Sequence, residues 1–145
     1  MPVPIFLAPV PCVHLASAMT VPALSTRVAF GSSKSGLSNS TPIGLPVFIF
    51  ASKGPHALYR NGVYTWTGTL GAIVPAVEKG SRSGKHPDKN MRPPTAEADD
   101  SAFTHFWEVL NLTRLERPQP FSDFFGCAPF EGKAPEWPVV GQLRD

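Results

Sequence analysis

One stretch, residues 99–118, constrains the fold most, because it has the pattern of a complete structural element. Aspartate and serine at 99–101 suit a helix N-cap, where the carboxylates also oppose the positive end of the helix dipole. Pro118 and Pro120 would stop a helix. Between these ends, large apolar side chains recur at the i, i+3, i+4 and i+7 spacing of one helix face: Phe103, Phe106, Trp107 and Leu110. The pattern predicts an amphipathic helix over about residues 100–117.

Proline and glycine interrupt the rest of the chain. The 145 residues include 17 prolines and 12 glycines, while hydrophobic residues make up 42%. Each proline lacks a backbone donor and restricts the residue before it, so it shortens a helix or a strand. The local patterns do not agree on one compact structure, as those of foldable sequences usually do. We therefore expect a mostly irregular or disordered chain without a globular fold.

The best β-forming material lies at residues 43–77. The apolar run at 43–50 contains aromatic and β-branched residues, which favour a short strand. Further along, Asn61-Gly62 separates two runs of strand-forming residues, and this dipeptide favours the type I′ turn of a hairpin. The sequence predicts short strands within 43–77 and a small β-hairpin at about 57–67.

The remaining segments differ from these two in composition. Residues 1–42 begin apolar and proline-rich, which favours extended backbone, and continue as a Gly/Ser-rich flexible segment. Residues 78–98 are polar and basic, which is typical of a disordered linker. Residues 119–145 alternate prolines with aromatic side chains, and 135–138 fits the P-x-x-P pattern that SH3-type grooves bind.

Charge is distributed unevenly. Residues 1–77 contain no Asp or Glu, although the formal net charge of the chain is only +2. Such a segment is typical either of a targeting sequence or of a reading frame never tuned for solubility. The small residues at 16–18 resemble a cleavage site, but no basic residue precedes the apolar run. No apolar run approaches the roughly 20 residues that span a bilayer, so we expect no transmembrane span. Cytoplasmic location is the default, with mitochondrial import or secretion as alternatives.

Residues that carry chemistry do not cluster in the sequence. Cys12 and Cys127 lie far apart and in no C-x-x-C pair, so we expect two separate thiols and no zinc site. The run at 80–85 departs from a phosphate-binding loop in its glycine spacing and in the residue after its lysine. No nucleophile elbow or H-E-x-x-H helix is present, although a triad that converges only in the fold stays open. The sequence predicts no enzyme activity, no cofactor and no metal.

The basic residues at 79–92 are spread out and are not interleaved with aromatic side chains. Because such a run would bind phosphates weakly at most, we expect no specific nucleic-acid binding. Aromatic side chains are better candidates, since an isolated helix of about seventeen residues is marginal in water unless its apolar face is buried. That face would dock on the chain itself or in a groove of another protein, with Trp107 at its centre. The predicted interaction residues are Phe103, Phe106, Trp107, Leu110, Phe121, Phe124 and Phe125.

The resulting hypothesis is a small, orphan-like protein without catalytic activity, of the kind that a recently arisen reading frame would encode. It would bind another protein through the helix at 100–117 and the aromatic tail. The alternative is a small organelle-imported or secreted protein whose acid-free N-terminal targeting segment is cleaved.

Overall fold

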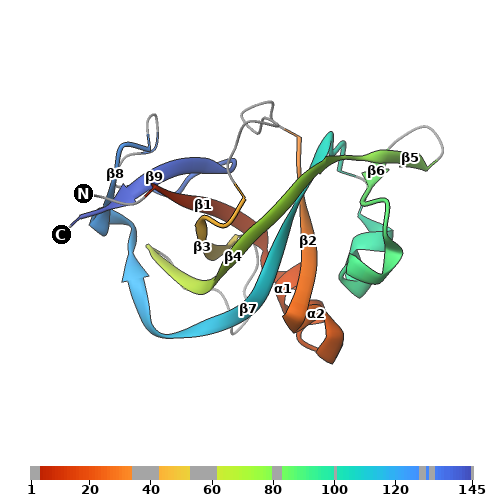
Figure 1. The fold of residues 1–145 in the computed structure, drawn as a ribbon, viewed down its shortest axis with the longest axis horizontal. Coiled ribbons are helices and arrows are strands. Elements are labelled where there is room, and N and C mark those ends of the chain that lie inside the picture. The colour runs from red at the N-terminus through yellow and green to blue at the C-terminus, as the bar shows by residue number, and fades with distance from the viewer. Residues whose placement is uncertain are drawn as a thin grey trace.

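The chain is built on one mixed β-sheet. The computed structural model describes residues 4–33, 43–52, 62–79, 83–99, 101–127, 130 and 133–144. Within these residues, seven strands form one sheet in the order β2-β7-β4-β3-β1-β9-β8, and β5 pairs separately with β6 (Figure 1). The strands are β1 (Pro4–Pro11), β2 (Arg27–Ser32), β3 (Pro46–Ser52), β4 (Val63–Pro75), β5 (Val77–Lys79), β6 (Ser83–Lys85), β7 (His105–Pro120), β8 (Phe124–Phe125) and β9 (Val139–Leu143). The helices are α1 (Cys12–Ala18) and α2 (Pro22–Thr26) and the 3-10 helices η1 (Lys89–Met91), η2 (Pro94–Ala98) and η3 (Phe121–Asp123).

The prediction of a mostly irregular or disordered chain is wrong, because apolar side chains cover both faces of this sheet. On one face, strands β1, β2, β3, β4 and β7 pack with α1 and α2 around Trp107. The other face carries an aromatic cluster around Tyr64 near β8 and β9, and a smaller cluster around Phe106. The neighbours Phe6 and Leu7 of β1 point to opposite faces, and both are 0% exposed. The prolines shorten the elements, but they do not prevent a core.

The amphipathic helix predicted for 100–117 is also wrong, since strand β7 occupies most of this stretch. β7 pairs antiparallel with β4 on one side and with β2 on the other. Side chains alternate along a strand, so Trp107 and Val109 enter the cluster with the helices while Phe106 and Glu108 point to the opposite face. Aromatic and β-branched residues favour strands, and pairing with two neighbours outweighs a local helical spacing.

Of the hairpin predicted at about 57–67, the structure describes the second arm, which belongs to β4; this strand pairs antiparallel with β3, and both strands lie within 43–77. Gly62 has a φ of 80°, a value that glycine adopts without strain, and β4 begins at the next residue. Residues 57–61, which include the first arm of the predicted hairpin, lie outside the described residues.

The segment 78–98, predicted as a disordered linker, contains β6, η1 and η2 and is anchored to the sheet. Lys85 is 5% exposed, and its Nζ donates hydrogen bonds to the backbone oxygens of Ala96 (2.5 Å) and Asp99 (2.8 Å). His86 is also buried and lies with its Nε2 2.9 Å from Glu108 Oε2 of β7. Two buried polar side chains therefore hold the segment in place.

A polar network joins α1 to η2. His14 Nδ1 lies 2.7 Å from Thr95 Oγ1, and His14 Nε2 lies 2.6 Å from Asp99 Oδ2. Ser17 Oγ lies 2.8 Å from Thr95 Oγ1. Asp99 was expected to cap a helix, but its Oδ1 accepts the backbone N–H of Ser101 in a turn at 2.8 Å. Burial alone would raise the pKa of Asp99, but hydrogen bonds from Ser101 and His14 outweigh burial and lower this pKa below its usual value.

This network predicts a loss of stability in acid. A carboxylate with a lowered folded pKa stabilises the fold fully above its unfolded pKa, which is about 3.9, and this contribution is lost as the pH falls through the folded pKa. We expect the midpoint of thermal unfolding to fall when the pH is lowered below about 4. Asp99→Asn should have a lower midpoint than the parent protein at neutral pH and a shallower fall in acid. Circular dichroism melts across the acid range measure how steeply the unfolding midpoint of each protein falls with pH. Equal slopes for the parent protein and Asp99→Asn would contradict the prediction.

Candidate functional site

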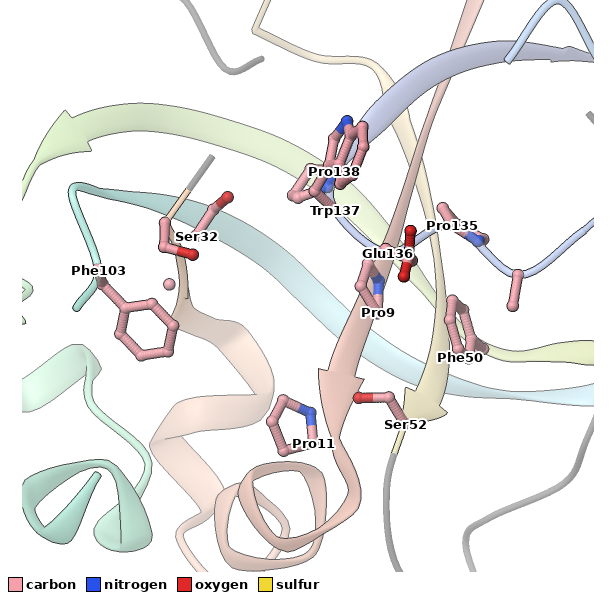
Figure 2. A pocket seen from close by; sticks show the side chains of 13 residues that line it. Pro9, Pro11, Ser32, Phe50, Ser52, Phe103, Pro135, Glu136, Trp137 and Pro138 are labelled. Carbon is pink, nitrogen blue, oxygen red and sulfur yellow. The ribbon is translucent and has the colours of Figure 1, made fainter. Parts of the chain in front are cut away.

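A cleft of about 460 Å³ opens where the parallel strands β1 and β3 end. Pro11 of β1 and Ser52 of β3 are register partners at this end of the sheet. The C-terminal end of β2 reaches the same place, and the segment before β9 crosses beside it (Figure 2). The described lining residues are Pro9, Pro11, Gly31, Ser32, Ser33, Phe50, Ser52, Phe103, Ala134, Pro135, Glu136, Trp137 and Pro138.

The prolines of β1 explain why the sheet is open here. β9 pairs with β1 from Pro4 to Leu7, while β3 pairs with β1 from Phe6 to Pro11. Pro9 therefore lies in the part of β1 where the register with β9 has ended. A proline has no backbone N–H and is tolerated where a strand has an unpaired side. The segment 134–138 diverges from β1 at this point, and the cleft occupies the space between them.

Aromatic side chains form the walls of the cleft and are held from behind by other rings. Figure 2 shows Phe103 and Phe50 on opposite sides, with Pro9 between them. Phe50 packs edge-on against Tyr64 at a centroid distance of 5.8 Å. Trp137 packs in the same way against Phe130 at 4.5 Å. Such edge-to-face pairs fix ring orientation, so the walls are largely pre-formed.

Phe103 keeps its place because Gly31 has no side chain. A Cβ at Gly31 would lie 2.5 Å from the Phe103 ring, which is closer than two carbon atoms can approach. Phe103 also packs edge-on against Phe106, with centroids 5.6 Å apart. The glycine in β2 therefore allows this ring to lie directly on the strand at the rim of the cleft.

The polar groups of the cleft are few. Three serines contribute hydroxyl groups: Ser32, Ser33 and Ser52. Glu136 is exposed and is the only charged side chain among the described lining residues. These described lining residues include no histidine, cysteine, lysine or arginine, so they offer neither a paired nucleophile and base nor a counter-ion for an anion.

The structure does not bring the predicted interaction residues together on one surface. Phe103 lines the cleft, whereas Trp107 (0% exposed) and Phe106 (4%) are buried in different core clusters. Phe121 and Phe124 are buried in the aromatic cluster around Tyr64. Leu110 and Phe125 are half-buried.

Sequence reasoning missed most of the cleft. Its residues in β1 and β3 carry no local motif, because their convergence depends on parallel pairing of distant strands. The segment at 135–138, which fits the P-x-x-P pattern that SH3-type grooves bind, forms part of the wall of the cleft. Pro135 and Pro138 are both buried, so their rings are not presented to a partner.

Comparisons of the chain with protein-family models, with curated proteins and with solved structures give no match. In the described part of the chain, no three His, Cys, Asp or Glu side chains are grouped so that they could hold a metal ion. Among the helices described, none is long and apolar enough to cross a membrane, in agreement with the expectation of no transmembrane span.

Proposed function

We propose that the protein binds a small organic cation with an apolar body in this cleft. One observation carries this proposal: the cleft has walls of aromatic rings and prolines, and Glu136 is the charged side chain among its described lining residues. Its volume of about 460 Å³ is in the range of small-molecule sites, which are commonly lined by apolar side chains with a few polar groups.

The charge of the ligand follows from the lining. A cation is attracted to the negative face of an aromatic ring, and Phe103, Phe50 and Trp137 supply three rings. Glu136 adds a carboxylate at the rim. An anion would meet this carboxylate without any basic side chain among the described lining residues. A cationic head with an apolar body therefore complements the site better than a neutral or anionic ligand.

Two features favour this proposal over the hypotheses drawn from the sequence. Binding of another protein rested on an aromatic helix face, which is replaced by a strand with Trp107 in the core. Cleavage of an N-terminal segment near 16–18 would remove β1, which lies between β3 and β9 in the sheet and lines the cleft. A protein that functions with this fold would retain the segment.

Titration with benzyltrimethylammonium tests the proposal. The signal is the indole N–H resonance of Trp137, assigned by its loss in Trp137→Phe. We expect saturable shifts with this cation, weaker binding of neutral benzyl alcohol, and no binding of benzoate. Glu136→Gln should weaken the binding of the cation about two- to fivefold, because an exposed cation interaction contributes about 0.5–1 kcal/mol.

Glu116→Gln is the matched control, since Glu116 is exposed on β7 and does not line the cleft. It should leave the dissociation constant unchanged. Benzyl alcohol that binds as tightly as the cation, with no effect of Glu136→Gln, would overturn the charge preference. Absence of any shift of the Trp137 resonance at millimolar ligand would overturn the site.

A further inference from the structure

The network between α1 and η2 has the arrangement of a hydroxyl nucleophile, an imidazole base and a carboxylate. Thr95 Oγ1 lies 2.7 Å from His14 Nδ1, and the other ring nitrogen lies 2.6 Å from Asp99 Oδ2. Thr95 and His14 are 81 residues apart in the chain. None of the three residues lines the cleft. Nucleophile, base and orienting group within hydrogen-bond reach of one another are what covalent catalysis requires.

The direction of the hydrogen bonds follows from the chemistry of the groups. An ionised Asp99 carboxylate can only accept, so His14 Nε2 carries the hydrogen. In the neutral imidazole, Nδ1 then has a lone pair and accepts the Thr95 hydroxyl hydrogen. Ser17 Oγ, 2.8 Å from Thr95 Oγ1, can donate to the threonine oxygen in turn. At 2.7 Å, His14 Nδ1 is a closer acceptor for the Thr95 hydrogen than the backbone oxygen of Val13 at 3.4 Å, so this proton is directed at a base that Asp99 orients.

Other contacts fix this geometry before any ligand arrives. The second oxygen of Asp99 accepts the backbone N–H of Ser101 at 2.8 Å. The buried Lys85 ammonium holds the backbone oxygens of Ala96 and Asp99, which close the turn of η2. Thr95 and Asp99 therefore lie on one anchored turn, and His14 lies on the helix that packs against it. Pre-organisation of this kind lowers the cost of reaching a reactive geometry.

The surroundings indicate what could reach the hydroxyl. His14 is 7% exposed, but Thr95 is half-buried. The backbone oxygen of Val13 lies 3.4 Å from Thr95 Oγ1, and Val13 is 51% exposed. An acyl group that reaches Thr95 at this surface would meet an apolar residue, which suits a short and uncharged acyl group.

We propose that Thr95 is an acyl-accepting nucleophile, with His14 as general base and Asp99 as the residue that positions His14, and that the site hydrolyses small esters with short apolar acyl groups. The Thr95 oxygen forms a bond to the ester carbonyl carbon and gives its proton to His14 Nδ1. The bond between this carbon and the leaving oxygen breaks, and His14 returns the proton to the alcohol that leaves. Water, deprotonated by His14, then attacks the threonine ester, releases the carboxylic acid and restores the hydroxyl.

Hydrolysis of p-nitrophenyl acetate by the full chain tests this proposal. We expect release of p-nitrophenol above that caused by free imidazole at equal concentration. Thr95→Val should lower the excess rate at least about tenfold, because it removes the nucleophile on which base catalysis acts. Thr113→Val is the matched control: Thr113 is exposed on β7, and its hydroxyl bonds only locally to Asn111 O in the described contacts.

A second readout separates catalysis from a structural role of the network. After an acid quench, mass spectrometry of the digested protein should find one acetyl group on the peptide that contains Thr95. Thr95→Ser keeps the oxygen, so it should retain both turnover and the adduct at position 95 even if Thr95→Val fails to fold. No rate above the imidazole background, or acetyl groups on lysines without one at position 95, would overturn the proposal.

Discussion

Replacing Trp107 with alanine is expected to lower the free energy of unfolding by about 3–5 kcal/mol, a large share of the 5–15 kcal/mol typical of a domain. Trp107 is 0% exposed and packs against Phe6 of β1 at a ring-centroid distance of 5.1 Å and against Phe30 of β2 at 5.3 Å. The alanine variant would lose the free energy of transferring the ring from water into the core. It would also leave a cavity beside the rings from β1 and β2. Urea unfolding followed by circular dichroism measures the loss.

Two further variants give this prediction its controls. Trp137→Ala should cost less, because Trp137 is half-buried at the rim of the cleft. Trp107→Phe should also cost less than alanine, since it keeps a ring and removes an indole N–H that is buried without a hydrogen-bond partner in the described structure. Equal losses for Trp107→Ala and Trp137→Ala would contradict the central place of Trp107 in the core.

The importance of Trp107 could be predicted from the sequence, but its surroundings could not. The aromatic residues of 103–110 have helical spacing, and no local rule shows that the segment pairs with strands at 27–32 and 63–75. Strand preference depends on such neighbours more than helix preference does. The long-range pairing, which is absent from any local window, therefore decided the fold.

A bulge in β7 makes the alternation of buried and exposed side chains along this segment irregular. Thr67 pairs with Thr113 and Thr69 with Leu110, so two steps along β4 correspond to three along β7. Asn111, in this interval, has a φ of 56°. One extra residue reverses the alternation of side chains. Leu112 therefore joins the core cluster of Trp107, although a regular strand would place it on the other face.

The two sites differ in what the sequence revealed of them. Phe103 was predicted as an interaction residue and lines the cleft, but Pro9 and Phe50 reach it only because β1 and β3 pair in parallel. His14 and Thr95 lie far apart in the chain, in segments predicted as extended backbone and as a disordered linker, so their contact depends on the packing of α1 on η2. The sequence does not exclude a catalytic triad whose members meet only in the folded chain. Nothing in the sequence, however, indicates which residues would meet.

His86→Ala is expected to lower the free energy of unfolding by about 3 kcal/mol, because it leaves a buried carboxylate without its buried partner. The Asp88 backbone N–H donates to His86 Nδ1 at 2.9 Å, so Nε2 carries the hydrogen and donates to Glu108 Oε2 at 2.9 Å. Both side chains are almost fully buried. Arg27 also reaches Glu108, at 3.1 Å, but its side chain is 56% exposed, and exposed ion pairs contribute little.

A second substitution shows whether charge or packing causes this loss. His86 also packs edge-on against Phe106, with centroids 6.0 Å apart, so alanine removes packing as well as a hydrogen bond. Adding Glu108→Gln to His86→Ala removes the unpaired charge and should recover part of the stability, whereas Glu108→Gln in the parent protein should destabilise it. His105→Ala is the control at a less buried histidine and should change stability by less than about 1 kcal/mol. The double variant could prove no more stable than His86→Ala in urea unfolding. Lost packing would then explain the effect, and the prediction that it comes from an unpaired Glu108 carboxylate would be wrong.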